Sequence, residues 1–316
     1  MLDRIPKGAH AAVIRLRSLG DCVLSTPALA LLHEARPDLR IGIVVEPWLK
    51  PVFTGNPAVS EILPPSSLRA WRPQLCLNLH GGTRSAWLTA TSGAQVRAGF
   101  EHFRFPFVYN VRIPKAQVIL GVDRTVHTAE HLASAMFYLG VPGQPIPRTR
   151  LFCGAGFQPA AGLQPAWWAS VKWPAGGLKA AAGSRPPHIV IHPFASARDK
   201  TWPADRFIRL AKTLSNVIFI GAAADDLSPF RAFPIAQGLD LEELKSLLSG
   251  AALFIGNDSG PAHMAAALGV PLVVFWGNSS REIWGPWRAE HVFLDDLARV
   301  PVEDALDAVE SLRVKA

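Results

Sequence analysis

The sequence predicts an α/β protein that contains two parallel-sheet domains. In both halves of the chain, short apolar runs alternate with segments of helical periodicity, a pattern typical of strand–helix–strand units. A segment rich in Gly, Pro and Ala at 154–187 separates the two halves. We therefore expect two Rossmann-like sheets facing a central cleft, with ligands bound at the carboxyl ends of the strands.

The first half is predicted to hold five strands and three helices. Pro37 ends the helix that follows the first strand, because proline cannot continue a helix. Gly140 follows the last helix and suits a C-cap. The strands are expected at 11–16, 40–45, 59–63, 74–79 and 95–99, and the helices at 22–35, 83–91 and 124–139.

The second half repeats this alternation. Pro203 lies near the first turn of one predicted helix, Asp240 suits the N-cap of another, and Gly269 ends a third. The strands are expected at 188–194, 216–222, 251–256 and 271–277, and the helices at 202–214, 240–249, 260–269 and 301–313. The chain therefore divides into domains at 1–150 and 188–300, a low-complexity linker or insertion at 151–187, and a terminal helix within 301–316.

Composition limits the classes of function. Hydrophobic residues make up 49% of the 316 residues, enough to build two cores. No apolar run reaches about 18 residues, so we expect no membrane-spanning helix. Residues 1–10 hold no apolar signal-peptide core, and we expect a cytoplasmic protein. The cysteines Cys22, Cys76 and Cys153 are few and far apart, which indicates neither a disulfide framework nor a zinc site.

The formal charge is +7, and the sequence contains no run of Lys or Arg residues. We therefore interpret the basic excess as spread along the chain. Such an excess suits an anionic partner: a nucleotide, a phosphorylated glycan or an anionic membrane surface. No nucleic-acid-binding motif appears. The sequence also lacks a dinucleotide fingerprint, a P-loop, a nucleophile elbow and a spaced Asp pair for metal chelation.

The segment FIGNDSGPAH at 254–263 places polar residues between an apolar strand and an apolar helix. Ser259 and Gly260 lie at the predicted helix N-terminus, where backbone N–H groups favour phosphate. Asp258 suits sugar hydroxyls better than phosphate, because two anions repel. His263 follows one turn later. The alternative is a simple helix cap by Asp258 or Ser259 with a structural His263.

Two further loops follow predicted strands. After the strand at 188–194, Ser196 and Lys200 could bind a diphosphate, or the loop could be a solvated basic turn. After the first strand, Asp21 could be a general base or an ordinary helix cap. Arg15 and Arg17 lie near it in the sequence and could meet an anionic acceptor.

Three segments occur in this order and at this spacing: RLRSLGDCVLSTPAL at 15–29, HPFASARDKTWPADRF at 192–207 and FIGNDSGPAHMAAALGVPLVVFWGNSS at 254–280. Together they resemble glycosyltransferase family 9, the ADP-heptose:lipopolysaccharide heptosyltransferases. Weaker matches cover 78–100, 127–140 and 275–287. The chain departs from the family at 154–187, at Ala222-Ala223 and at Asn278.

The resemblance implies a GT-B fold, with the acceptor bound by the N-terminal domain and the donor by the C-terminal domain. It implies inverting transfer of heptose from ADP-heptose to the inner core of lipopolysaccharide, without a cofactor or an obligatory metal. The partners would be the sugar nucleotide and a lipid-linked anionic glycan, with peripheral association at the inner membrane. The helix at 301–313 could cross back to the first domain.

The same resemblance implies roles for individual residues. Asp21 would be the catalytic base. The donor would be bound by Ser196, Lys200, Asp225, Asp258, Ser259, Gly260 and His263, and the acceptor by Arg15, Arg17 and Arg84. Two alternatives stay open on the same fold: a nucleotide-sugar 2-epimerase-like enzyme and a non-catalytic nucleotide-sugar-binding paralogue. The single strong acid in the N-terminal half, Asp21, favours transfer over epimerisation.

Overall fold

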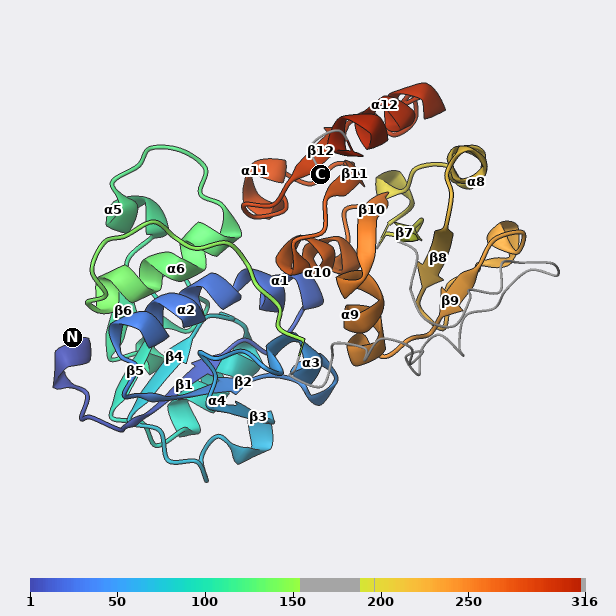
Figure 1. Cartoon of the computed structure of the whole chain (residues 1–316). Helices are drawn as coiled ribbons and strands as arrows, with labels where there is room; N and C mark the ends of the chain where they lie inside the picture. The colour runs from blue at the N-terminus through green and yellow to red at the C-terminus, as the bar shows by residue number, and fades with distance from the viewer. Residues whose placement is uncertain (154–187, 196, 314–316) are drawn as a thin grey trace. The chain divides into compact units, whose positions relative to one another are not determined.

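The computed structural model describes residues 1–153, 188–195 and 197–313, which fall into two compact units (Figure 1). The first unit consists of Met1–Phe152 and Glu282–Trp287, and the second unit contains the remaining described residues. Residues 154–187 of the predicted linker at 151–187, and Ser196, lie outside the described residues. No helix among the described residues is long and apolar enough to cross a membrane.

The first unit is built on a parallel sheet with the strand order β3-β2-β1-β4-β5-β6. Its central strands are buried along almost their whole length, as expected for a parallel sheet covered on both faces. The strands are β1 (His10–Ile14), β2 (Arg40–Val44), β3 (Glu61–Leu63), β4 (Leu75–Asn78), β5 (Val96–Phe100) and β6 (Val111–Ile113).

Helices cover both faces of this sheet (Figure 1). On one face α2 and α6 pack against each other. On the other face Leu88 of α4 packs with Ala12, Ile14 and Cys76. The helices are α1 (Leu19–Leu24), α2 (Thr26–Ala35), α3 (Lys50–Phe53), α4 (Thr83–Thr91), α5 (Ala116–Leu120) and α6 (Thr128–Leu139).

The single helix predicted at 22–35 is two helices, α1 and α2, which meet at Ser25. Pro27 lies in the first turn of α2 and has no N–H to continue the helical ladder. The hydroxyl of Thr26 instead donates to the carbonyl of Val23 at 2.8 Å, and that of Ser25 donates to Cys22 at 2.7 Å. The break keeps the carbonyl groups at the end of α1 satisfied.

The second unit has an equivalent sheet, with the order β12-β11-β10-β7-β8-β9 and parallel pairings throughout. Its strands are β7 (His188–His192), β8 (Val217–Gly221), β9 (Ile235–Gln237), β10 (Ala251–Asn257), β11 (Leu272–Phe275) and β12 (His291–Leu294). Its helices are α8 (Ala204–Thr213), α9 (Leu241–Ser249), α10 (Gly260–Leu268) and α12 (Val302–Arg313). Helix α11 (Arg281–Trp284) belongs to the first unit except for Arg281. The predicted α/β GT-B class, with two Rossmann-like sheets, agrees with this topology.

Trp202 lies at the centre of the second core. Its ring is fully buried, stacks on Phe275 with centroids 4.1 Å apart, and meets Phe207 edge to face at 4.8 Å. Its indole N–H donates to the carbonyl of Val300 at 3.1 Å. The residue therefore belongs to the core rather than to the predicted helix at 202–214, which begins at Ala204.

The expected return of the terminal helix to the first domain is wrong. Helix α12 packs into the core of the second unit through Val302, Ala305 and Val309. The part of the chain that returns to the first unit is Glu282–Trp287. These corrections follow from contacts between residues far apart in the sequence.

The returning segment is held by His127 at the start of α6. The Nε2 atom of His127 lies 2.9 Å from the carbonyl oxygen of Gly285, and its ring stacks on Trp287 with centroids 4.7 Å apart. The indole N–H of Trp287 donates to Pro147 at 2.9 Å. The Nδ1 atom of His127 accepts from Ala129 N–H, so Nε2 carries the proton and the ring also caps α6.

We predict that Gly256→Ala destabilises the protein by about 1–3 kcal/mol. A methyl group at Gly256 would lie 2.7 Å from the backbone oxygen of His192, its register partner on β7, so the two strands would have to shift. Gly143→Ala is the matched control, since a methyl group there meets nothing within 4 Å. Urea unfolding measures both, and equal stabilities of the two variants would contradict the packing argument.

Candidate functional site

Asp21 lies in the first turn of α1, the helix that follows β1, at the carboxyl edge of the first sheet. Ser18 is the N-cap of α1, and Asp21 is the third residue of that helix. Its Oδ2 atom accepts from the Ser18 hydroxyl at 2.9 Å and from the Ser18 N–H at 3.4 Å, which completes a capping box. The capping role is therefore real, yet 20% of the side chain remains exposed. One carboxylate can both close the turn and face a ligand.

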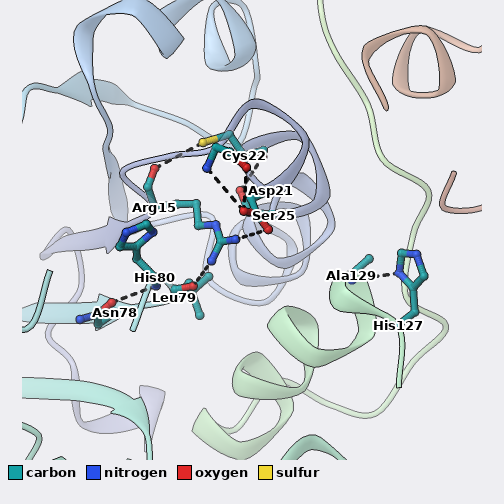
Figure 2. A network of polar contacts seen from close by, with 10 residues as sticks. Arg15, Asp21, Cys22, Ser25, Asn78, Leu79, His80, His127 and Ala129 are labelled. Atoms are coloured by element: carbon teal, nitrogen blue, oxygen red, sulfur yellow. Dashed lines mark hydrogen bonds and ion pairs between the residues drawn. The ribbon is translucent and has the colours of Figure 1, made fainter. Parts of the chain in front are cut away.

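Arg15 holds the other side of this carboxylate, as Figure 2 shows. Its guanidinium is buried, with one nitrogen ion-paired to Asp21 Oδ1 and another donating to the carbonyl of Leu79 at 2.5 Å. A buried cation with two fixed partners is a poor candidate for direct contact with an acceptor. The geometry instead makes Arg15 the residue that orients Asp21.

The other two arginines predicted to bind the acceptor lie on the surface. Arg17 is exposed. Arg84, in the first turn of α4, is exposed and ion-paired to Glu46, which follows β2. The structure thus brings segments after β1, β2 and β4 to one edge of the sheet, and the acceptor-binding roles of Arg17 and Arg84 stay predictions.

His80, in the loop after β4, also lies at this site, and no sequence pattern singled it out. The Oδ1 atom of Asn78 at the end of β4 accepts from the backbone N–H of His80 at 2.9 Å, as Figure 2 shows. It also accepts from the backbone N–H of Gly81 at 3.1 Å. Burial, and secondarily the charge of Arg15, lowers the pKa of His80 below its usual range. A neutral imidazole therefore lies in the electrostatic field of Asp21 and Arg15.

Cysteine chemistry is disfavoured at this edge. Cys22 follows Asp21 directly, but its thiol is buried and lies 3.5 Å from the carbonyl of Arg15. Burial raises the pKa of Cys22 to about 12, which keeps it a thiol at neutral pH. All three cysteines are unpaired, as expected.

In the second unit, the polar residues of the 254–263 segment connect neighbouring loops. Asn257 is fully buried at the end of β10, and its Oδ1 atom accepts from the Trp202 N–H at 3.0 Å. Asp258 accepts from the Ser279 hydroxyl at 2.6 Å. The alternative of a helix cap by Asp258 is therefore wrong, since the N-cap is Ser259 and the Asp258 carboxylate fixes the loop that follows β11.

The loop that follows β7 joins the same edge of the second sheet. Asn278 donates from Nδ2 to the carboxylate of Asp199 at 2.9 Å. Gly277 lies so close to Lys200 that a methyl group on it would be 2.9 Å from the Lys200 Cα atom. Lys200, in the 3-10 turn Arg198–Lys200, is half-buried beside these loops. The departure from the family at Asn278 is thus part of the loop packing.

The N-terminus of α10 opens at this edge. Ser259 is its N-cap, but the hydroxyl makes no capping hydrogen bond and instead lies 3.2 Å from His192 Nδ1. Gly260 begins the helix without a side chain, and Pro261 follows. The simple capping interpretation is wrong for Ser259 too. Without a side-chain cap, this N-terminus retains its affinity for an anion.

Two other predicted donor residues have different surroundings. Asp225 accepts from the Ala222 N–H at 2.7 Å, and its own carbonyl accepts from Gln237 Nε2 at 2.8 Å, so it braces the turn after β8. His263 is buried one turn into α10. Among the residues that the structure describes, no three His, Cys, Asp or Glu side chains gather as a metal site.

Solved structures share this architecture. A glycosyl transferase family 9 protein from Veillonella parvula superposes with a TM-score of 0.83 at 22% identity, covering 98% of each chain. ADP-heptose lps heptosyltransferase II of Escherichia coli superposes with a TM-score of 0.76 at 20% identity, covering 97% of this chain and 99% of that one. These likenesses confirm the GT-B fold.

The model of glycosyltransferase family 9 (heptosyltransferase) matches residues 66–301, most of the chain. The chain belongs to glycosyltransferase family 9. Lipopolysaccharide heptosyltransferase 3 of Escherichia coli (strain K12) is 24% identical over 92% of this chain and 90% of its own length. Lipopolysaccharide heptosyltransferase 1 of Pseudomonas aeruginosa is 24% identical over 89% and 82% respectively. This family 9 protein is therefore a glycosyltransferase, as the three segments indicated.

We predict that His192 makes stability depend on pH. Burial lowers the pKa of His192 to about 4, so the folded protein keeps it neutral while the unfolded chain gains a proton below about pH 6.5. The neutral His192 ring therefore contributes fully to the free energy of unfolding above about pH 6.5. That free energy falls by roughly 2 kcal/mol between about pH 7 and about pH 5, because the unfolded chain is protonated there and the folded protein is not. Urea unfolding of His192→Asn should show a shallower loss over this window. An unchanged slope would contradict the account.

Proposed function

We propose that this family 9 protein is an inverting, metal-independent heptosyltransferase. It moves a heptose from ADP-heptose to the inner core of lipopolysaccharide or a related glycan. The observation that carries the proposal is the Asp21 network, a partly exposed carboxylate fixed by Ser18 and Arg15. The names of the relatives support the substrate class, and one similar solved structure holds ADP-2-deoxy-2-fluoro heptose.

In the proposed reaction, an acceptor hydroxyl attacks the anomeric carbon of the heptose as the bond to ADP breaks. Asp21 accepts the hydroxyl proton, so the forming ether oxygen does not carry a positive charge. ADP leaves with the electron pair of the broken bond. A single displacement of this kind inverts the anomeric configuration.

The leaving diphosphate gains negative charge, which the donor side must stabilise. The N-terminus of α10 at Gly260 and the ammonium of Lys200 supply positive potential without a metal. Asp258 and Asp225 accept hydrogen bonds and suit the sugar and ribose hydroxyls. Ser259, Ser196 and His263 complete the proposed donor set.

Arg15 is proposed as a positioning residue for the base. Its contacts with Asp21 and the Leu79 carbonyl fix the carboxylate relative to the end of β4. This role replaces the acceptor contact that the resemblance implied.

We predict that Asp21→Ala lowers turnover on the order of a hundred- to ten-thousand-fold while ADP-heptose binding stays near that of the wild type. Transfer is measured in EDTA with product anomers read by NMR, and binding by calorimetry. Asp123→Ala, an exposed acid of the same unit, is the control. Full turnover by Asp21→Ala would show that Asp21 is not the catalytic base. Loss of wild-type turnover in EDTA would overturn metal independence.

We predict that Arg15→Gln lowers kcat roughly ten- to hundred-fold and changes the KM for the acceptor little, because the Asp21 carboxylate loses the ion pair that orients it. Arg17→Gln is the contrast: it should raise the KM for the acceptor and leave kcat near that of the wild type. Steady-state kinetics with varied acceptor measures both constants. If the two variants change kcat and KM in the same way, Arg15 has no special relation to the base.

A further inference from the structure

His192 is a buried imidazole that the proposed reaction does not use. It ends β7, one of the two central strands of the second sheet, and only 8% of its surface is accessible. Its ring meets Phe194 edge to face, with centroids 5.9 Å apart. Its register partner on β10 is Gly256, where a methyl group would lie 3.2 Å from the His192 Cβ atom. A polar ring packed this closely is costly to bury unless it forms a hydrogen bond.

The hydrogen-bonding partner of this ring is Ser259. The Nδ1 atom of His192 lies 3.2 Å from the Ser259 hydroxyl oxygen, so the end of β7 is joined to the start of α10. Ser259 is the N-cap of α10, yet its hydroxyl does not cap the helix. The direction of that hydroxyl is therefore set by His192 and not by its own helix.

The number of protons shared by this pair limits what Ser259 can do. Burial lowers the pKa of His192, which the charge of Asp225 opposes only in part, so the ring is neutral at pH 7 and carries one N–H. If Nε2 carries that proton, Ser259 must donate to Nδ1, and its hydroxyl offers only lone pairs to a ligand. If Nδ1 carries it, the ring donates to Ser259, and the hydroxyl hydrogen is free for an anion.

This edge of the second sheet has a use for such a donor. Pro261, in the first turn of α10, has no N–H, so the helix N-terminus has one backbone donor fewer than usual. Asn257 at the end of β10 is fully buried, and its Nδ2 atom has no hydrogen-bond partner among the described residues. Unsatisfied donors of this kind call for an oxygen-rich ligand.

We propose that His192 is a positioning residue for the diphosphate of the sugar donor. Its Nδ1–H donates to the Ser259 oxygen, and the Ser259 hydroxyl donates to a phosphate oxygen. Each hydrogen bond in such a chain polarises the next, so the bond to phosphate strengthens as the leaving group gains charge. The inference rests on the proposed function, which brings the diphosphate to α10. It requires a nucleoside diphosphate but no particular sugar.

The first test is a double-mutant cycle on ADP binding, measured by calorimetry with the full chain. Ser259→Ala should weaken binding roughly tenfold or more, because a hydrogen bond to a charged group is lost. His192→Leu should weaken it roughly three- to tenfold, because the hydroxyl is no longer oriented. The double variant should bind as weakly as Ser259→Ala alone, because His192 acts only through Ser259.

Two further variants separate hydrogen bonding from packing. His192→Asn should recover most of the affinity lost in His192→Leu, because an asparagine amide nitrogen is bonded to Cγ as Nδ1 is. His188→Leu is the matched control. His188 begins the same strand, is equally buried, and has its Nε2 atom 3.0 Å from the carbonyl oxygen of Leu247. Urea unfolding compares the stabilities of the two leucine variants, and His188→Leu should bind ADP nearly as the wild type does.

The tautomer of His192 is the most direct measurement. Nitrogen-15 NMR of the histidine side chains distinguishes a protonated Nδ1 from a protonated Nε2, and the His192→Asn spectrum identifies the signal. In the ADP complex at pH 7, we expect the proton on Nδ1. A ring that only fills space would bind ADP equally well in either tautomer.

Four results would overturn the inference. The losses in the double variant could be additive, or His188→Leu could weaken ADP binding as much as His192→Leu. His192→Leu could tighten ADP binding, or the ADP complex could hold the proton on Nε2; either would show that Ser259 donates to His192 and not to phosphate. Absence of heptosyl transfer with the coupling intact would refute only the proposed function.

Discussion

Parallel pairing governs both units of this protein. Every strand pairing in the described part of the chain is parallel, so each strand must be followed by a return across a face of the sheet. All strand ends that lead into helices therefore lie at one edge of each sheet. The Asp21 turn and the open N-terminus of α10 occupy those edges because of this constraint.

The side chains predicted to form the site also hold their loops in place. Asp21 closes the cap of α1 while presenting a carboxylate, and Asp258 fixes the loop after β11 through Ser279. Buried Asn257 connects the end of β10 to the Trp202 backbone. A rigid loop costs little to order when a ligand binds, so these contacts prepare the site. For Asp21 the structure shows the capping role, and the role as a base is the proposal made above.

The sequence was informative where burial imposes a pattern. The strands β1, β2, β4, β7 and β10 are continuous apolar runs, and their positions were predicted to within a few residues. Strands β6, β9 and β12 were missed, because they are three or four residues long at sheet edges and carry little apolar signal. The Arg15–Asp21 pair and the return of Glu282–Trp287 depend on tertiary contacts, which periodicity does not encode. The first unit holds 17 basic and ten acidic residues, and the remaining residues hold 15 of each sign, so the net charge of +7 belongs to the first unit. The sequence could not show this, because the count depends on the boundaries of the units.

In the proposed reaction, the first unit supplies the base, and the second unit supplies the helix N-terminus that stabilises the leaving diphosphate. This proposal requires the carboxyl edge of the second sheet to bind an adenosine diphosphate sugar. Calorimetric titration of the full chain with ADP-, UDP- and GDP-sugars measures that binding. We expect saturable binding of ADP-heptose at concentrations where the UDP- and GDP-sugars do not bind. A clear preference for a UDP- or GDP-sugar would contradict it and leave the fold intact.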